Sequence, residues 1–128
     1  IIQAILMVQR EVANTMLALP SSSNYNRFSV FVQFHFYVKR LFDVFPDAFY
    51  PKPKVYSTLL LLKPKTTKIN NEKFLLFLNR LFLARRKTVY NNLRKAGIFI
   101  SLSSDIMDKR PQELSMEEIF RMYKECNS

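Results

Sequence analysis

The sequence predicts an α/β fold in its first half and a small all-α fold in its second half. Short apolar runs at residues 4–8 and 55–62 are typical of strands. A polar stretch over residues 64–71, PKTTKINN, is the clearest domain boundary. Beyond this stretch the apolar residues recur at helical spacing. We therefore expect one domain over residues 1–63 and another over residues 64–128.

The first strand leads directly into a helix. Residues 4–8, AILMV, lack polar alternation, as expected for a strand that is buried on both faces of a parallel sheet. Near-helical spacing of apolar residues predicts a helix over residues 11–19, which Pro20 ends. A strand followed by a helix is half of a β-α-β unit, and ligands bind at the carboxyl ends of such strands. Gln9 and Arg10 occupy that end.

Two further strands follow a polar loop at residues 21–27. Residues 28–36, FSVFVQFHF, fit a strand or a helix, and we favour a short helix that passes into a strand over residues 37–44. Together with the strand over residues 55–62, this strand makes an antiparallel pair. The connection FPDAFYPKPK is then an ordered loop displayed at one end of the pair.

The connection carries side chains that suit a nucleobase. Phe49 places an aromatic ring at the head of the segment FYPKPK, and two prolines stiffen the approach. Lys52 and Lys54 add positive charge beside the ring. A rigid lip with a stacking ring and cations is a reasonable way to hold an unpaired base.

The second half is predicted to be helical. Helical spacing of apolar residues predicts a helix over residues 74–82. A second helix over residues 88–96 has Gly97 as its C-terminal stop. Residues 103–110 form a possible third helix, ended by a proline. The last helix begins with a capping box, Ser115-Met116-Glu117-Glu118.

Positive charge is concentrated in the middle of the chain. The formal net charge is +10 and the pI is near 10.0. Between Lys63 and Lys95 the sequence has ten Lys or Arg residues and one acidic residue, Glu72, which gives +9 for this segment. The partners that this charge favours are nucleic acid or an acidic membrane face, and the alternative is a soluble protein that is merely basic.

Arg85, Arg86 and Lys87 form the densest cluster, at the predicted corner between two helices. Side chains of this kind contact nucleic-acid phosphates and position the protein without reading the base sequence. The alternative is a solvated corner whose aliphatic stems cover apolar surface.

Several classes of site are disfavoured by composition. Cys126 is the only cysteine, so no disulfide within the chain is possible, and we expect no metal site and a reducing, cytoplasmic setting. Gly97 is the only glycine, so the chain carries no glycine-rich nucleotide loop of its own. No apolar run approaches the roughly 20 residues that span a bilayer. His35 fits a core position better than a catalytic one. We expect a monomer that does not bind membranes.

Five segments in order resemble the C-terminal half of ribosomal RNA adenine dimethyltransferases. They are VQREVANTML, YNRFSVFVQF, LFDVFPDAFYPKPKVYSTLLLLKP, FLNRLFLARRKTVYNNLRKAG and RPQELSMEEIFRMYK. The F-x-P-x-P-K-V-x-S and RRKT-x-x-N-x-L signatures together are specific. The RRKT corner followed by RPQELS is most similar to the bacterial small-subunit enzymes of the KsgA type. Macrolide-resistance methylases share the F-x-P-x-P-x-V segment, but the RRKT corner and the RPQELS tail favour the housekeeping branch.

The resemblance implies an S-adenosylmethionine-dependent enzyme that dimethylates two adjacent adenines of a small-subunit rRNA hairpin at N6 during ribosome assembly. It implies a Rossmann-like methyltransferase domain followed by a helical RNA-binding domain. The target adenine leaves the stack, and the residue matching Phe49 covers one of its faces. Lys52 and Lys54 would hold flanking phosphates, while the cluster at residues 85–87 would contact the RNA backbone. Gln9 and Arg10 would line the site at the strand end.

The chain also departs from the family pattern. The glycine-rich cofactor loop, an acidic ribose-binding residue and an N-[LI]-P-Y motif precede the matched region in family members, and this sequence has none of them. We therefore expect the 128 residues to be a fragment that binds RNA, but neither binds the cofactor nor methylates. Asn26 stands where the family commonly has glycine. The alternatives are a non-catalytic RNA-binding or ribosome-assembly module and a resistance-type methylase acting on large-subunit rRNA.

Overall fold

The computed structural model describes residues 2–45, 56–66 and 69–126. Contacts between Cα atoms divide the chain into two compact units. The first holds the described residues of Ile1–Ala18 and Phe28–Thr67, and the second holds those of Leu19–Arg27 and Lys68–Ser128. Residues 19–27, which contain the expected polar loop at residues 21–27 and the predicted end of the preceding helix, thus group with the second unit. That residues 1–63 and residues 64–128 form separate domains stays a prediction.

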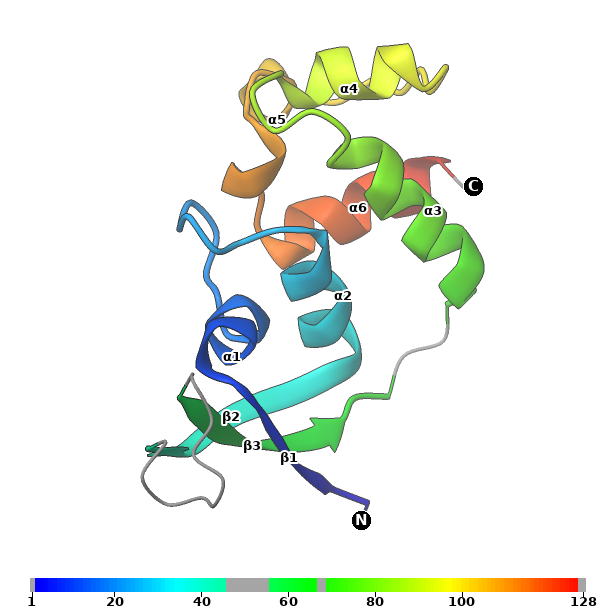
Figure 1. The fold of residues 1–128 in the computed structure, drawn as a ribbon. Helices are drawn as coiled ribbons and strands as arrows, with labels where there is room; N and C mark the ends of the chain where they lie inside the picture. The colour runs from blue at the N-terminus through cyan, green and yellow to red at the C-terminus, as the bar shows by residue number, and fades with distance from the viewer. Residues whose placement is uncertain (1, 46–55, 67–68, 127–128) are drawn as a thin grey trace. The chain divides into compact units, whose positions relative to one another are not determined.

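The first unit is a small α/β structure with a three-stranded sheet (Figure 1). Its elements in chain order are β1 Ala4–Gln9, α1 Arg10–Met16, α2 Arg27–His35, β2 Phe36–Val44 and β3 Ser57–Pro64. The strand order is β1-β3-β2, and β3 is antiparallel to both neighbours. The predicted antiparallel pair is therefore confirmed, as is the helix that passes into a strand near residue 36.

The expectation of a fully buried parallel strand at residues 4–8 is wrong for the described residues. β1 lies at the edge of the sheet and pairs antiparallel with β3, and Ile5 and Met7 are 60% and 54% exposed. An apolar run indicates hydrophobicity but does not specify the direction of the neighbouring strand. The β-α-β geometry is nevertheless present, because β1 and β2 both oppose β3 and so run parallel to each other.

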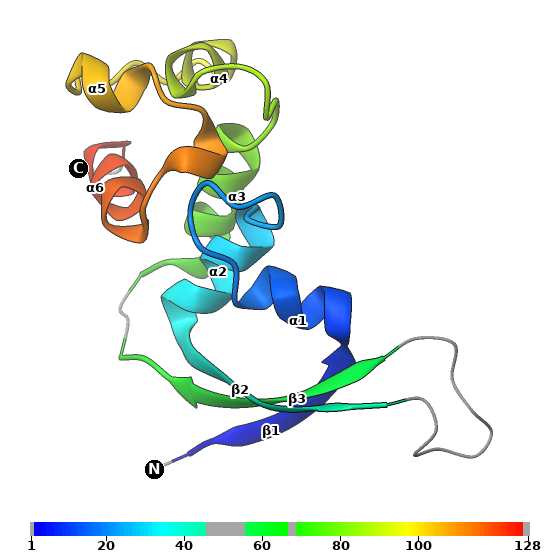
Figure 2. The same ribbon diagram turned by 90° about the vertical axis from the view of Figure 1, so that its left-hand side faces the viewer.

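The core of the first unit lies between the sheet and its two helices. α1 and α2 lie on the same side of the sheet (Figure 2). Alternate residues of β3 face them, and Leu60 and Leu62 are buried against Ala13, Met16 and Val32. Fully burying one such aliphatic side chain contributes about 1.5–3 kcal/mol. The leucine run of β3 therefore holds both helices to one face.

α1 ends at Met16, earlier than the predicted end at residue 19. The side-chain amide of Gln33 on α2 donates hydrogen bonds to the carbonyls of Met16 and Ala18, at 2.9 Å and 2.8 Å. These bonds satisfy carbonyls that a longer helix would have used itself. The residue before Pro20 is also disfavoured in the helical conformation.

All regular elements of the second unit in the described residues are helical. They are α3 Asn71–Leu81, α4 Val89–Lys95, α5 Ser104–Met107, a 3₁₀ helix Pro111–Glu113 and α6 Met116–Cys126. The helix expected over residues 103–110 is only one turn long. Lys109 turns away from it, and its carbonyl accepts a hydrogen bond from Val89 N at 2.7 Å.

Aromatic and aliphatic side chains fill the core of the second unit. Phe74 and Phe77 of α3 both contact the Tyr123 ring of α6 edge-on, with centroids 5.1 Å and 5.7 Å apart. Tyr25, expected in a polar loop, is fully buried, and its ring lies 6.5 Å from that of Phe82. Burial, with the Glu118 carboxylate nearby, raises the pKa of the Tyr25 hydroxyl above its ordinary value. This tyrosine explains why residues 19–27 belong with the helices.

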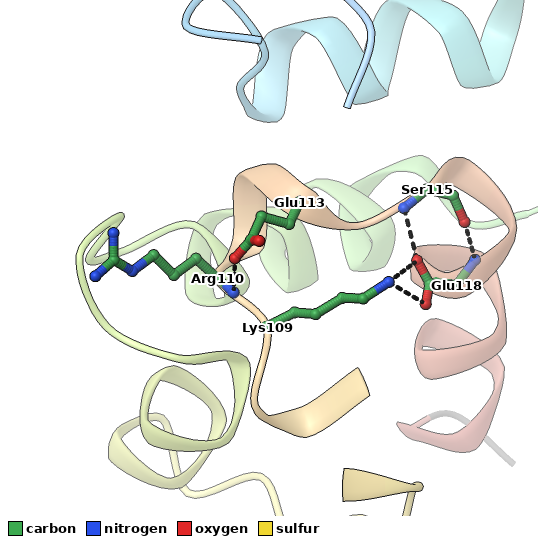
Figure 3. Close-up of polar contacts among 5 residues, drawn as sticks. All are labelled: Lys109, Arg110, Glu113, Ser115 and Glu118. Atoms are coloured by element: carbon green, nitrogen blue, oxygen red, sulfur yellow. Dashed lines mark hydrogen bonds and ion pairs between the residues drawn. The ribbon is translucent and has the colours of Figure 1, made fainter. Parts of the chain in front are cut away.

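The predicted capping box of α6 is confirmed (Figure 3). Ser115 N donates to Glu118 Oε1 at 2.9 Å, and Glu118 N donates to Ser115 Oγ at 3.2 Å. Lys109 Nζ adds an ion pair to Glu118 Oε2 at 3.1 Å. Burial alone would raise the pKa of Glu118, but the Ser115 hydrogen bonds and Lys109 hold that pKa below its usual value. The charged carboxylate thus joins the start of α6 to the segment before it.

We expect Glu118→Ala to lower the free energy of unfolding by about 1 kcal/mol at neutral pH, because a cap is lost. The folded pKa of this carboxyl is below the unfolded one. Its stabilisation is therefore present at neutral pH and is lost as the pH falls below the usual value of 4.5. Urea unfolding at several pH values measures both effects.

Glu118→Gln separates the charge from the cap, because glutamine still accepts the Ser115 hydrogen bond while it no longer titrates. The free energy of unfolding of the Glu118→Gln variant should change less with pH than that of the wild type. Glu117→Ala is the matched control, since Glu117 lies in the same helical turn and outside the capping box. Equal losses for Glu117→Ala and Glu118→Ala would contradict the cap.

Candidate nucleic-acid interface

The predicted adenine-contacting lip lies outside the described residues. This applies to Phe49, Lys52 and Lys54, whose roles stay predictions. The structure does describe the base from which the connection starts and to which it returns. Gln9 at the end of β1 and Val44 at the end of β2 both pair with Ser57, the first residue of β3. The connection therefore leaves the sheet at the carboxyl ends of β1 and β2, the edge where α/β sheets bind ligands.

Two aromatic rings flank the connection at this edge. Phe45 precedes it and Tyr56 follows it, and their rings meet edge-on with centroids 5.5 Å apart. Arg10 contacts Tyr56: its guanidinium carbon is 4.4 Å from the Tyr56 centroid, and its backbone N–H donates to Tyr56 O at 2.9 Å. Gln9 and Arg10 are thus at the predicted strand end, and their role in a site stays a prediction.

A polar network underlies the same edge. Arg40 on β2 donates to Asp43 Oδ1 at 2.8 Å and, through its other terminal nitrogen, to Asn14 Oδ1 at 2.6 Å. The buried Thr58 hydroxyl donates to Asp43 Oδ1 at 2.7 Å and accepts from Arg40 at 3.3 Å. The network joins α1, β2 and β3 where the connection begins.

A β-bulge makes this network possible. In regular alternation, residues 40 and 43 would face opposite sides of the sheet. The register shift between Arg40 and Phe42 brings Arg40 opposite Leu60 and Asp43 opposite Thr58, on the same face. The Thr58 hydroxyl, followed by the charges of Arg40 and Arg10, lowers the pKa of the Asp43 carboxyl despite some desolvation. Asp43 therefore stays ionised and keeps its arginine partner in place.

The predicted basic corner is a short turn in the second unit. Arg85, Arg86 and Lys87 lie between α3 and α4, in the turn that precedes Thr88. Thr88 caps α4, since its hydroxyl accepts from Asn91 N at 3.2 Å. Three neighbouring cations held in one turn supply the kind of contact that phosphates require.

Asn92 is the residue that holds this corner. Its side chain is buried, and its Oδ1 accepts from Ala84 N at 2.9 Å. Its Nδ2 donates to the carbonyls of Ala84, Lys87 and Thr88, at 3.0 Å, 3.3 Å and 3.0 Å. The amide thus binds both ends of the basic turn. The signature RRKT-x-x-N-x-L specifies Asn91 and leaves Asn92 as an unspecified position, so no sequence pattern singled out Asn92.

The structure groups the predicted residues into two sets. Gln9 and Arg10 belong to the first unit and the cluster at residues 85–87 belongs to the second. Sequence reasoning missed Arg40, Asp43 and Tyr56, because a bulge and ring contacts leave no local pattern.

His35 packs edge-on against Phe31, with ring centroids 4.6 Å apart, and burial lowers the pKa of His35.

The described parts of the chain show neither a metal-binding cluster nor a membrane-spanning helix. No group of three or more His, Cys, Asp or Glu side chains there is arranged to hold a metal ion. Among the described helices, none is both long and apolar enough to cross a membrane.

Comparison with known proteins identifies the family. A family model described as ribosomal RNA adenine dimethylase matches residues 1–128. The chain belongs to the ribosomal RNA adenine dimethylase family. This finding confirms the family inferred from the sequence segments.

Curated relatives of this family member are named ribosomal RNA small subunit methyltransferase A. The protein from Thermotoga maritima is 40% identical over 123 residues, which cover 95% of this chain and 43% of the relative. The protein from Borreliella burgdorferi is 36% identical over 132 residues, covering 98% and 47%. The chain therefore spans about half the length of the curated relatives it matches.

Solved structures support the fold of this chain. A dimethyladenosine transferase from Plasmodium falciparum superposes with a TM-score of 0.85 at 24% identity, covering 98% of this chain and 57% of that one. The 23S rRNA methyltransferase ErmE superposes with a TM-score of 0.54 at 16% identity, covering 98% and 55%. The small α/β structure with its antiparallel strands is thus consistent with a methyltransferase fold.

We expect Asn92→Ala to lower the free energy of unfolding by about 2–3 kcal/mol, because Ala84 N and the Lys87 carbonyl lose their side-chain partner. The Ala84 and Thr88 carbonyls still accept backbone hydrogen bonds from Lys87 N and Asn92 N. Urea unfolding of the chain measures this loss. Asn91→Ala is the matched control: Asn91 is the exposed neighbour in the same helix. If Asn91→Ala destabilises the chain as much as Asn92→Ala, the corner does not depend on the buried amide.

Proposed function

We propose that this chain is the RNA-binding and adenine-positioning part of an S-adenosylmethionine-dependent rRNA adenine N6-dimethyltransferase. In this proposal, the whole protein methylates two adjacent adenines in a small-subunit rRNA hairpin during ribosome assembly. The observation that carries it is membership of the dimethylase family over residues 1–128. The names of the curated relatives support the small subunit as the substrate.

The first unit is proposed to position the target adenine. The connection between β2 and β3 carries Phe49, whose ring would stack on the extruded base. The contact between Phe45 and Tyr56 and the Arg40 network lie at the two ends of this connection. We expect them to limit the movement of the strand ends from which the Phe49 ring would reach the base. Lys52 and Lys54 would contact the flanking phosphates.

The second unit is proposed to bind the RNA backbone. One turn carries Arg85, Arg86 and Lys87, and the Asn92 side chain fixes that turn by hydrogen bonds to the backbone of Ala84. Neutralising several phosphates releases condensed counterions, which supplies much of the binding energy and makes it depend on salt. A helical RNA-binding domain in this half of the chain is part of the proposal.

The methyl donor of the proposed reaction is S-adenosylmethionine, and no residue of this chain is assigned to it. In this proposal the described residues do not hold the cofactor. The carboxyl ends of β1 and β2 present Arg10 and Arg40, which are occupied by Tyr56, Asp43 and Asn14. The single glycine of the sequence lies after α4, so the chain offers no glycine-rich turn. We propose that the chain alone binds RNA without methylating it.

Replacing Arg85, Arg86 and Lys87 together by glutamine should weaken RNA binding and flatten its salt dependence. For every phosphate that the variant no longer neutralises, the slope of log affinity against log salt should fall by about 0.7–0.9. Filter binding of a small-subunit rRNA hairpin over a range of salt concentrations measures the slope. The triple glutamine variant of Arg110, Arg121 and Lys124, which are exposed residues of the same unit, is a control of equal charge. An unchanged slope in the corner variant would remove these residues from the interface.

In the whole protein, Phe49→Ala should cost roughly 1–3 kcal/mol of base stacking, felt mainly in turnover. Phe49→Tyr keeps the ring and should retain most activity. Methyl transfer to immature small subunits measures both variants, and transfer to large-subunit rRNA is assayed beside it. Activity on the large subunit alone would favour a resistance-type methylase. An absence of transfer to either RNA would favour a non-catalytic RNA-binding module.

A further inference from the structure

The side chains of Tyr90, Arg94 and Phe99 form a cluster in the second unit that the proposed function does not use. We name this cluster the Arg94 platform. Arg94 Nη1 donates to Tyr90 Oη at 2.7 Å. The Arg94 guanidinium carbon lies 5.3 Å from the Tyr90 ring centroid and 5.2 Å from that of Phe99. One cation therefore contacts two aromatic rings.

The end of α4 builds the platform. Tyr90 and Arg94 are four residues apart on α4 and so lie on the same face of the helix. Gly97 has φ +78°, a conformation that favours glycine. Gly97 N and Ile98 N donate to the carbonyls of Arg94 and Leu93, at 3.0 Å and 2.9 Å, which is a Schellman ending. This ending reverses the chain and brings Phe99 back to Arg94.

The rings are open to solvent. Phe99 is 71% exposed and Tyr90 is 43% exposed, although both are large side chains that gain from burial. They border a hollow of about 300 Å³ that is also lined by Ile98, Ile100, Ser101 and Met107. The hollow thus has apolar walls, ring surfaces and room for a planar group.

The charge of the hollow favours an anionic ligand. Among the described residues that line it, Arg94 is the single charged side chain, and none is a carboxylate. A neighbouring hollow shares Ile98, Phe99 and Ile100, and its described lining adds Lys73 and Arg80 against one acid, Glu125. A third hollow, which shares Tyr90, Ile100, Ser101 and Met107, adds one acid, Asp108. Among the described lining residues of the three hollows, cations therefore outnumber acids by three to two. A hydrophobic peptide would gain from the apolar walls but not from this charge.

We propose that the Arg94 platform binds an unpaired nucleotide of RNA. The base stacks on the exposed Phe99 ring, and the phosphate lies near the Arg94 guanidinium. Aromatic rings and arginine planes are the usual partners of splayed bases in single-stranded RNA. The inference rests on the proposed function, which supplies RNA as the ligand, and it adds a binding site to those proposed at Phe49 and at the basic corner.

A tryptophan reporter tests the stacking directly. The sequence contains no tryptophan, so Phe99→Trp introduces a single fluorophore at the platform. Leu19→Trp is the matched control, because Leu19 is also 71% exposed and belongs to the same unit. Titration of the full chain with an oligoadenylate of about ten nucleotides should quench the emission of the Phe99→Trp variant. The emission of the Leu19→Trp variant should stay nearly unchanged.

Affinity provides the second readout. Phe99→Ala should bind the same oligoadenylate about 5-fold to 150-fold more weakly, whereas Phe99→Tyr should bind within about 3-fold of the wild type. Leu19→Ala should also bind like the wild type. Because Phe99 is exposed, these variants should keep the unfolding midpoint of the wild type, which urea unfolding checks.

The outcomes separate the platform from the proposed function. If the Phe99→Trp variant is not quenched and Phe99→Ala binds as the wild type does, the platform is overturned and RNA binding by the basic corner stays in place. Failure of the wild-type chain to bind RNA at low salt overturns both. A blue shift of the Phe99→Trp emission that grows with protein concentration without RNA also overturns the platform, because it assigns Phe99 to contact between copies.

Discussion

The first unit depends on β3, the strand that lies between β1 and β2 and runs opposite to both. β3 supplies hydrogen bonds to both neighbours, so removing its pairing would leave the described strands of this unit without a sheet. On one face of β3, Leu60 and Leu62 also pack against the buried side chains of α1 and α2. A single strand therefore provides both the backbone pairing and the apolar surface for the packing. The connection that would hold a base ends at the start of this strand.

The bulge in β2 places polar side chains together at the end of the sheet where the connection begins. It brings Arg40 and Asp43 to one face, where the buried hydroxyl of Thr58 bonds the Asp43 carboxylate. A buried hydroxyl without a partner would destabilise the sheet, so the carboxylate satisfies it while also holding the arginine. The ionised state of Asp43 is consequently part of the structure of this edge.

Asn92 has the corresponding role in the second unit. One buried amide satisfies four backbone groups of the basic turn, which carries three cations in succession. The end of α4 uses backbone geometry instead, since Gly97 reverses the chain and returns Phe99 to Arg94. Both devices hold cationic side chains at defined positions on the surface of this unit.

The sequence by itself determined the elements whose signals are local. The Ser115 capping box, the Gly97 stop and the antiparallel pair were predicted because each depends on residues that are close in the chain or on simple alternation. The family followed from the order of its segments. Tertiary structure decided the edge position of β1, the burial of Tyr25 and the contacts of Arg40, because each depends on residues far away in sequence. A bulge shifts which side chains share a face, and no local pattern records that shift.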